Sequence, residues 1–284
     1  MKELLIEVKG IETVYYRVEG RKTPIIFIHG AGADSSKLSW KEVTQRLASQ
    51  IEHELILVDL PGHGQTGYID GIEYSQDFYV QFVASFIEAL NLKEVILAGI
   101  SLGAGIALGY CIAHEDRVKQ LCLIAPNGLA KKWNYHMLSY HLFVNTPLNL
   151  WSYRLMAKSK GLTKQIIKAG LFFDEKNITN DVLNDVFQSV QYKHAGKAFE
   201  SYQQSEFQGR DGVKTYYTPK LNEIKTPTLF VHGKQDRSVS LKDVKLAHHE
   251  LKDSQLYIIE NARHWPQKEH SMEFCQVFVD FLVE

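Results

Sequence analysis

The chain has 284 residues, a hydrophobic fraction of 45%, a charged fraction of 23% and a formal net charge of −1 at pH 7. This length admits one large α/β domain or two small ones, and the balanced charge excludes the basic field that nucleic-acid binding requires. No segment is apolar for long enough to span a bilayer, and the N-terminus lacks the uninterrupted apolar run of a signal peptide.

The cysteines indicate the compartment. Cys111, Cys122 and Cys275 lie in separate apolar segments, without the CxxC spacing of a zinc or redox site. An odd number of such residues argues against a disulfide framework, so we expect buried free thiols. The sequence therefore predicts a cytoplasmic protein without a metal or another cofactor.

In chain order, the first 126 residues alternate short β-rich runs with helical patterns. A turn at Lys9-Gly10 predicts an antiparallel pair at the start, and the later continuous apolar runs predict strands covered on both faces. The predicted strands here are Leu4–Val8, Val14–Val18, Pro24–Ile28, Leu55–Val58, Val95–Ala98 and Val118–Ile124. The predicted helices are Trp40–Ala48, Tyr74–Leu90 and Ser101–His114. Such alternation is typical of a mostly parallel sheet with helices on both faces.

From about residue 127 to residue 220 the pattern changes. This stretch has no strand-like apolar run, is helical, and is unusually rich in aromatic residues. The final part returns to the α/β pattern, with strands at Thr228–His232 and Gln255–Ile259 and helices at Asp243–Leu251 and from Pro266 onward. We therefore predict an α/β core of residues 1–126 and 221–284. A helical cap, residues 127–220, is expected over the carboxyl edge of the sheet, where ligands bind in such folds.

Residues 98–105, AGISLGAG, place a lone hydroxyl between glycines where a buried strand is expected to become a helix. Gly99 and Gly103 leave room where a β-carbon would clash. The hydroxyl of Ser101 would project at a helix N-terminus, which favours developing negative charge. The GxSxG pattern is weak evidence alone and gains weight from the strand before it and the helix after it. We expect Ser101 to be a nucleophile.

A serine hydroxyl needs a base, and the base needs an orienting acid. His264, in ENARHWPQKEH, follows one predicted strand, and Asp236, in TLFVHGKQD, follows another. Both positions are expected at the same edge of the sheet as the serine. The alternative position for the acid follows the strand ending at Ile124, where the uncharged Asn127 stands. This favours Asp236, for which a turn cap is the competing interpretation.

The negative charge of an acyl-transfer intermediate needs two backbone N–H donors. The residue after the nucleophile, Leu102, is expected to supply one donor. Ala31, in the loop IHGAGADSS that follows Pro24–Ile28, is expected to supply the other. The neighbouring His29 is expected to shape this loop without a chemical role.

The segments HGAG, DLPGHGQT, GISLGAG, KTPTLFVHGKQD and RHWPQKEHSMEFCQVFVDFL resemble, in order and spacing, the α/β-hydrolase superfamily over almost the whole predicted core. The resemblance implies an eight-stranded, mostly parallel sheet with a variable cap, and a structural role for Asp59. It also implies a serine hydrolase with a catalytic triad and an oxyanion hole. The site residues would be the side chains of Ser101, Asp236 and His264 and the backbone N–H groups of Ala31 and Leu102. A serine at the nucleophile position disfavours the epoxide hydrolases and haloalkane dehalogenases, whose nucleophile is aspartate.

The C-terminal segment is similar to that of the meta-cleavage C–C bond hydrolases, which attack vinylogous diketones. Two features depart from that subfamily: the oxyanion loop reads GAGADS without an extra Gly-Pro-Gly, and Ile100 stands where the subfamily has asparagine. The sequence therefore favours a hydrolase of small apolar or aromatic carboxylic esters, acting through an acyl-enzyme on Ser101. A C–C bond hydrolase is the first alternative. A small-molecule receptor or signalling protein that retains the triad is the second.

Overall fold

The computed structural model describes residues 1–133 and 136–283, and within these ranges eight strands form one sheet in the order β1-β2-β4-β3-β5-β6-β7-β8. The first three strands of this order pair antiparallel, and all later neighbours pair parallel. The strands are β1 (Lys2–Val8), β2 (Ile11–Val18), β3 (Lys22–Ile28), β4 (His53–Val58), β5 (Val95–Ile100), β6 (Val118–Ile124), β7 (Thr228–Gly233) and β8 (Ser254–Ile259). The predicted strands and the mostly parallel α/β-hydrolase sheet are confirmed.

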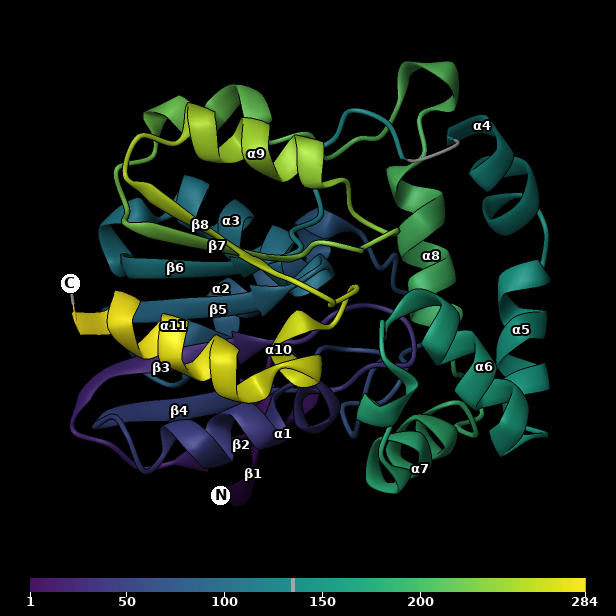
Figure 1. Cartoon of the computed structure of the whole chain (residues 1–284), viewed down its shortest axis with the longest axis horizontal. Coiled ribbons are helices and arrows are strands. Elements are labelled where there is room, and N and C mark those ends of the chain that lie inside the picture. The colour runs from purple at the N-terminus through teal and green to yellow at the C-terminus, as the bar shows by residue number, and fades with distance from the viewer. Residues whose placement is uncertain (134–135, 284) are drawn as a thin grey trace.

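Helices cover both faces of the sheet (Figure 1). One face carries α2 (Gln76–Ala89), α3 (Leu102–Ala113) and α9 (Leu241–Glu250), and the other carries α1 (Ser36–Leu47), α10 (Pro266–Glu269) and α11 (Ser271–Val283). The single helix predicted from Pro266 onward is wrong in one respect. His270, with φ −126° and ψ 53°, leaves the helical backbone and separates α10 from α11.

Two hydrophobic cores follow from the alternation of side chains along the strands. In β3, Ile26 and Ile28 face the core under α2 and α3, whereas Ile25 and Phe27 face the core under α1 and α11. The apolar runs of the central strands are continuous because both faces are covered. Trp40 of α1 is fully buried in the second core, with its ring centroid 5.0 Å from that of Phe27.

The loops at the carboxyl ends of the strands are held together by buried polar groups. Asp59, after β4, accepts hydrogen bonds from the backbone N–H and the hydroxyl of Ser36 and from the N–H of Gln65. These bonds fix the start of α1 against the loop after β4, which agrees with the structural role implied for Asp59. Cys111, Cys122 and Cys275 are free and buried, as predicted.

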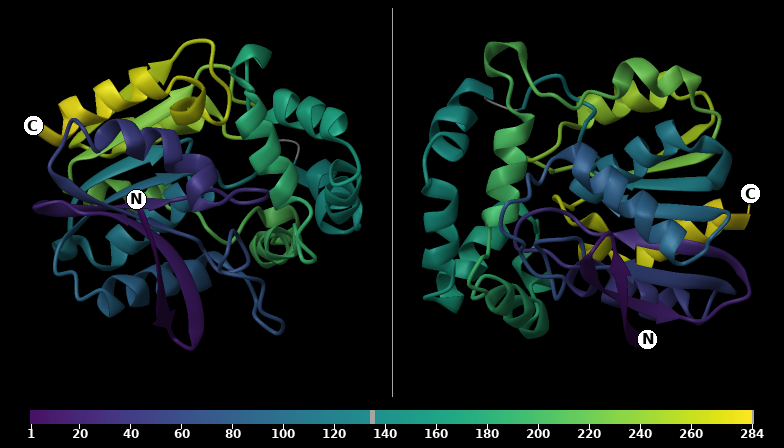
Figure 2. Two further views of the ribbon diagram at one scale, coloured as in Figure 1. Left: turned by 90° about the horizontal axis from the view of Figure 1, so that it is seen from below. Right: turned by 180° about the vertical axis from the view of Figure 1, so that it is seen from behind.

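Between β6 and β7 the chain forms a layer of helices beyond the carboxyl ends of the strands (Figures 1 and 2). These are α4 (His136–Ser139), the π-helical turn η2 (Tyr140–Val144), α5 (Leu148–Met156), α6 (Lys160–Gly170), α7 (Asn180–Ser189) and α8 (Lys197–Glu206). Ser159 and Thr179 cap the starts of α6 and α7 with their side chains. All of these helices lie in the segment for which the sequence predicts a cap, and its described residues contain no strand.

Replacing Trp40 with alanine should remove a large fully buried side chain from the core under α1 and α11. Substitutions of this kind cost about 3–5 kcal/mol of unfolding free energy, because the cavity collapses only in part. Urea denaturation of Trp40→Ala and of Trp151→Ala, whose tryptophan is 53% exposed, provides the comparison. A loss below about 1 kcal/mol for Trp40→Ala, or an equal loss for both variants, would contradict this packing.

Candidate active site

Ser101 occupies a strained turn between β5, which ends at Ile100, and α3, which begins at Leu102. Its backbone has φ 54° and ψ −115°, in a region that non-glycine residues seldom adopt. Glycines make the turn possible: a β-carbon on Gly99 would lie 2.4 Å from the carbonyl carbon of Gly103. A β-carbon on Gly103 would lie 2.3 Å from the backbone oxygen at the end of β3. The predicted turn from strand through serine to helix is therefore present, and it leaves no room for a β-carbon at either glycine.

His264 and Asp236 form a hydrogen-bonded pair from two different strand ends. Nδ1 of His264 lies 2.8 Å from Oδ2 of Asp236, whose side chain is fully buried. The other carboxylate oxygen accepts bonds from the N–H groups of Ser238 and Val239. Since a carboxylate only accepts, Nδ1 carries the proton and Nε2 is left free to receive one.

The electrostatic surroundings support opposite charges on this pair. Burial by itself lowers the pKa of His264, but the charge of Asp236, its hydrogen bond and the charge of Asp34 together raise that pKa above its ordinary value. Burial by itself raises the pKa of Asp236. The charge and the hydrogen bond of His264 oppose this and, with smaller contributions from other neighbours of Asp236, hold that pKa below its ordinary value. Asp236 is therefore ionised, and its field stabilises an imidazolium at His264.

A second histidine, His232 on β7, lies beside the pair and was not identified from the sequence. Its Nε2 is 3.9 Å from Oδ2 of Asp236, its side chain is fully buried, and neither ring nitrogen has a hydrogen-bond partner among the described residues. Burial lowers the pKa of His232, although the charge of Asp236 opposes this. Because a neutral imidazole at this position carries no charge, the carboxylate of Asp236 interacts electrostatically mainly with His264.

Ser101 and His264 line one cavity of about 360 Å³ between the sheet edge and the cap. No hydrogen bond joins their side chains among the described residues; catalytic hydrogen bonds are often long before substrate binds. Most of the lining is apolar. Its large apolar side chains are Met156, Ile166, Ile167, Leu171, Val186, Phe199 and Trp265, and its described lining residues include no lysine or arginine.

The loop after β3 lines this cavity with Gly30, Ala31, Gly32 and Ala33. The N–H of Gly30 is occupied, because it donates to Oδ2 of Asp34 at 2.8 Å. The next residue, Ala31, lines the cavity. Leu102 is the first residue of α3, so its N–H has no acceptor within the helix. The two donors predicted from the sequence are therefore near Ser101, and their use as an oxyanion hole remains a prediction.

Two residues fix the shape of this loop. His29 connects it to the loop after β4, since Nε2 accepts from the N–H of Leu60 at 3.0 Å and Nδ1 lies 2.7 Å from the oxygen of Gly30. Asp34 also accepts from the hydroxyl of Ser39. The structural role expected for His29 agrees with these contacts. Asp34 was not identified, although an aspartate just before a helix is a common signal of local capping.

The loop that carries His264 is also attached to the cap. Glu269 accepts from the N–H groups of Phe173 and Asp174 at 2.7 and 2.8 Å, and from the N–H of Arg263 at 3.1 Å. The guanidinium of Arg263 donates to the carbonyl oxygen of Ala169 at the end of α6. The position of the proposed base therefore depends on the cap as well as on the core.

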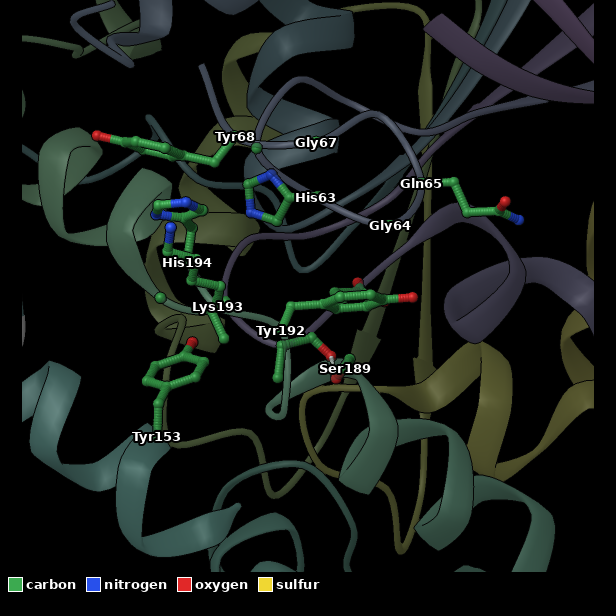
Figure 3. Close-up of a pocket in the computed structure, with 16 residues that line it drawn as sticks. His63, Gly64, Gln65, Gly67, Tyr68, Tyr153, Ser189, Tyr192, Lys193 and His194 are labelled. Atoms are coloured by element: carbon green, nitrogen blue, oxygen red, sulfur yellow. Dashed lines mark hydrogen bonds between the residues drawn. The ribbon is translucent and has the colours of Figure 1, made fainter. Parts of the chain in front are cut away.

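A second cavity, of about 440 Å³, adjoins the first and shares Tyr153 and the glycine loop with it (Figure 3). Its character differs because Lys193, His194 and His63 line it. Burial is the main cause that lowers the pKa of His63 to about 3, so this imidazole is neutral. His194 stacks on the ring of Tyr68, with 5.1 Å between ring centroids. The cavity lined by Lys193 therefore lies beside the apolar cavity that contains Ser101 and His264.

Two features are absent from the described residues. No group of three or more His, Cys, Asp or Glu side chains is placed to hold a metal ion. No helix among the same residues is both long and apolar enough to cross a membrane.

Comparison with known proteins places these features in a family. A family model described as the alpha/beta hydrolase fold matches residues 23–271. A 2-hydroxy-6-oxo-6-(2'-aminophenyl)hexa-2,4-dienoic acid hydrolase from Metapseudomonas resinovorans is 28% identical, over 99% of this chain and 90% of its own. A 2-hydroxy-6-oxo-6-phenylhexa-2,4-dienoate hydrolase from Comamonas testosteroni is 25% identical, over 95% and 91%. A solved serine hydrolase involved in carbazole degradation, the CarC enzyme, gives a TM-score of 0.80 at 26% identity, covering 99% of this chain and 98% of that one. Because the family model matches most of its length, the chain belongs to the α/β-hydrolase family.

Proposed function

We propose that the protein is a serine hydrolase that cleaves a C–C bond in 2-hydroxy-6-oxo-dienoates of the meta-cleavage type. The observation that carries this proposal is the similarity, over at least 95% of this chain, to two hydrolases named for such substrates. It supports the C–C alternative of the sequence analysis better than the ester interpretation that the sequence favoured. The apolar cavity with Trp265 and Phe199 suits the aryl group that these substrate names contain.

The mechanism assigns one role to each group. Oγ of Ser101 adds to the 6-oxo carbonyl carbon while Nε2 of His264 takes the hydroxyl proton, and Asp236 stabilises the imidazolium. The resulting oxyanion accepts bonds from the N–H groups of Ala31 and Leu102. When the carbonyl re-forms, the bond between C5 and C6 breaks, and the departing carbon takes the proton from His264. Water, activated by the same histidine, then releases the acyl group.

Carboxylic ester hydrolysis is the second candidate, and the charge of the cavity favours it. The relatives' substrates are acids, yet the lining described for the catalytic cavity contains no lysine or arginine. Ile100 is fully buried in the core, so the residue before the nucleophile offers no polar side chain to a dienol. A neutral ester needs neither a cation in the cavity nor a polar side chain before the nucleophile. The same Ser101, His264 and Asp236 would perform both reactions.

The cytoplasm is the compartment we propose for this reaction. The buried free thiols Cys111, Cys122 and Cys275 agree with the cytoplasmic setting predicted from the sequence.

A direct comparison of substrates tests the bond that is cleaved. We expect kcat/KM for 2-hydroxy-6-oxo-6-phenylhexa-2,4-dienoate, followed by loss of its absorbance, to exceed that for p-nitrophenyl butyrate by at least about 100-fold. Ser101→Ala should lower turnover of both by about a million-fold, because the nucleophile is removed. The reverse preference would support the ester candidate. Activity that survives in Ser101→Ala would refute the assigned nucleophile for either bond.

The pH profile tests the base. Only neutral His264 can take the serine proton, and its pKa is raised, so kcat/KM should fall on the acid side at a pH above the ordinary histidine value of about 6.5. Asp236→Asn removes the charge that contributes to this shift. The acid limb should then move to lower pH, and turnover should fall by about ten-thousand-fold. An acid limb at the same pH in both proteins would contradict the proposed pair.

A further inference from the structure

The charge of the chain is unevenly distributed along the cap. Residues 127–173 contain seven lysine and arginine residues and no aspartate or glutamate, in a chain whose formal net charge is −1. The seven are Lys131, Lys132, Arg154, Lys158, Lys160, Lys164 and Lys168. This half of the cap is therefore strongly basic, and the remainder of the chain is acidic.

The same segment carries most of the large apolar side chains that the described residues expose. We use the name basic apolar surface for these exposed side chains and the seven basic residues of the same segment. Its apolar members are Met137, Leu138, Leu142, Leu148, Trp151, Leu155, Leu162, Ile166 and Phe173, which are between 37% and 57% exposed. Exposed apolar side chains that share one face mark an interaction site, whereas single exposed apolar residues need no explanation.

Helix α5 shows that this exposure is directional. Leu148, Trp151 and Leu155 follow helical spacing and are exposed, with Trp151 at 53%, whereas Tyr153 and Met156 face the protein interior. In Figure 1 and in the right view of Figure 2, α4 and α5 form the outermost layer, on the side of the cap away from the sheet. The outward side of α5 thus has no partner within the described chain.

The basic groups differ in how far they are already neutralised. Lys164 and Lys168 pair with Glu175, at 2.8 and 2.5 Å. Arg154 and Lys158, which flank the exposed side of α5, are exposed and form no ion pair with the described residues. The end of α5 therefore presents free positive charge beside exposed apolar side chains.

We propose that the basic apolar surface docks on a bilayer that contains anionic lipids. Exposed leucines and a tryptophan would enter the region between headgroups and acyl chains, and the lysines and arginine would lie against lipid phosphates. Charge complementarity selects this occupant over a second copy of the chain. Symmetric association through this surface would bring together two sets of like charges, including Arg154 and Lys158, which have no ion-pair partner among the described residues.

Docking would place the catalytic cavity next to the bilayer. Ile166 lines that cavity and is 37% exposed, so the cavity and the basic apolar surface meet at this side chain. Tyr153 and Met156 line the cavity from the inner side of α5. A hydrophobic substrate dissolved in the bilayer would therefore have a short path to Ser101. The proposal does not depend on which bond Ser101 cleaves.

Vesicle sedimentation tests the docking. The intact chain is mixed with vesicles of phosphatidylcholine alone or of phosphatidylcholine and phosphatidylglycerol, and we expect sedimentation only with the second. The double variant Trp151→Ser/Leu155→Ser should bind at least about 10-fold more weakly, because both apolar contacts are lost. Raising the salt to about 0.5 M should weaken binding of the wild type by screening the lysines.

A matched control separates docking from folding. Leu246→Ser removes an apolar side chain of comparable exposure, 44%, from α9 on the core, and should bind as the wild type does. All three proteins should hydrolyse p-nitrophenyl acetate, or turn over the dienoate, at the same rate without vesicles, since none of the changed residues lines the catalytic cavity. Equal sedimentation with both vesicle types, no sedimentation, or equal binding by the double variant would overturn the proposal. So would a dimer of the wild type in light scattering that the double variant loses.

Discussion

The close approach of three backbone segments at the end of β5 is the constraint on which the site depends. Ser101 is held at φ 54°, a conformation that costs about 1–3 kcal/mol and persists only where surrounding contacts enforce it. The enforcing contacts are hydrogen bonds: the N–H of Ser101 donates to the oxygen of Ile124, and its own oxygen accepts from Gly105 and Asn127. Hydrogen bonds from the end of β6 and the residues after it thus fix the turn, and Ser101 lines the cavity.

The same logic explains why Asn127 stands after β6. A carboxylate there would be an alternative partner for His264, but this position is used differently. The N–H of Asn127 supports the turn at Ser101, and its side chain donates to the hydroxyl of Tyr202 in the cap. Asp236, the acid that we propose for the triad, instead follows β7 and accepts bonds from two backbone N–H groups in its own loop. Asn127, after β6, therefore supports the turn at Ser101, and the loop after β7 holds the carboxylate of Asp236.

The cap helices contact the loop that carries His264. Glu269 joins the His264 loop to Phe173 and Asp174 after α6, and Arg263 joins it to Ala169 at the end of α6. The N–H of Trp265 donates to the oxygen of Leu171. The residues on both sides of His264 therefore contact the end of α6 and the residue that follows it. Since Ser101 and His264 share a cavity without a hydrogen bond, a small shift of this loop is a direct way to bring Nε2 to the hydroxyl.

The sequence predicted the strands well because their apolar runs are continuous and their ends carry glycine or polar residues. It predicted which residues meet at the sheet edge, since parallel strands bring their carboxyl ends together. The break at His270 was missed, because a single residue with non-helical backbone leaves no trace in the periodicity. The bonds from Glu269 to Phe173 and Asp174 span more than 90 residues, so no local pattern could indicate them. The second cavity forms where the helices between β6 and β7 pack against the core. The sequence pattern of such polar helices indicates their packing position only weakly.

The arrangement of charge constrains where an acidic substrate can lie. His264 must be neutral to accept a proton, yet Asp236 and Asp34 already raise its pKa. A carboxylate bound within the apolar cavity would raise that pKa further and would lose its own hydration without a cation to replace it. In the reaction that we propose, the dienoate would direct its acid group past Tyr153, toward the cavity lined by Lys193 and His194, with its aryl ketone beside Ser101. A neutral ester carries no charge that needs a cation nearby. The two candidate reactions use the same nucleophile, so they differ mainly in where the charge of the substrate must lie.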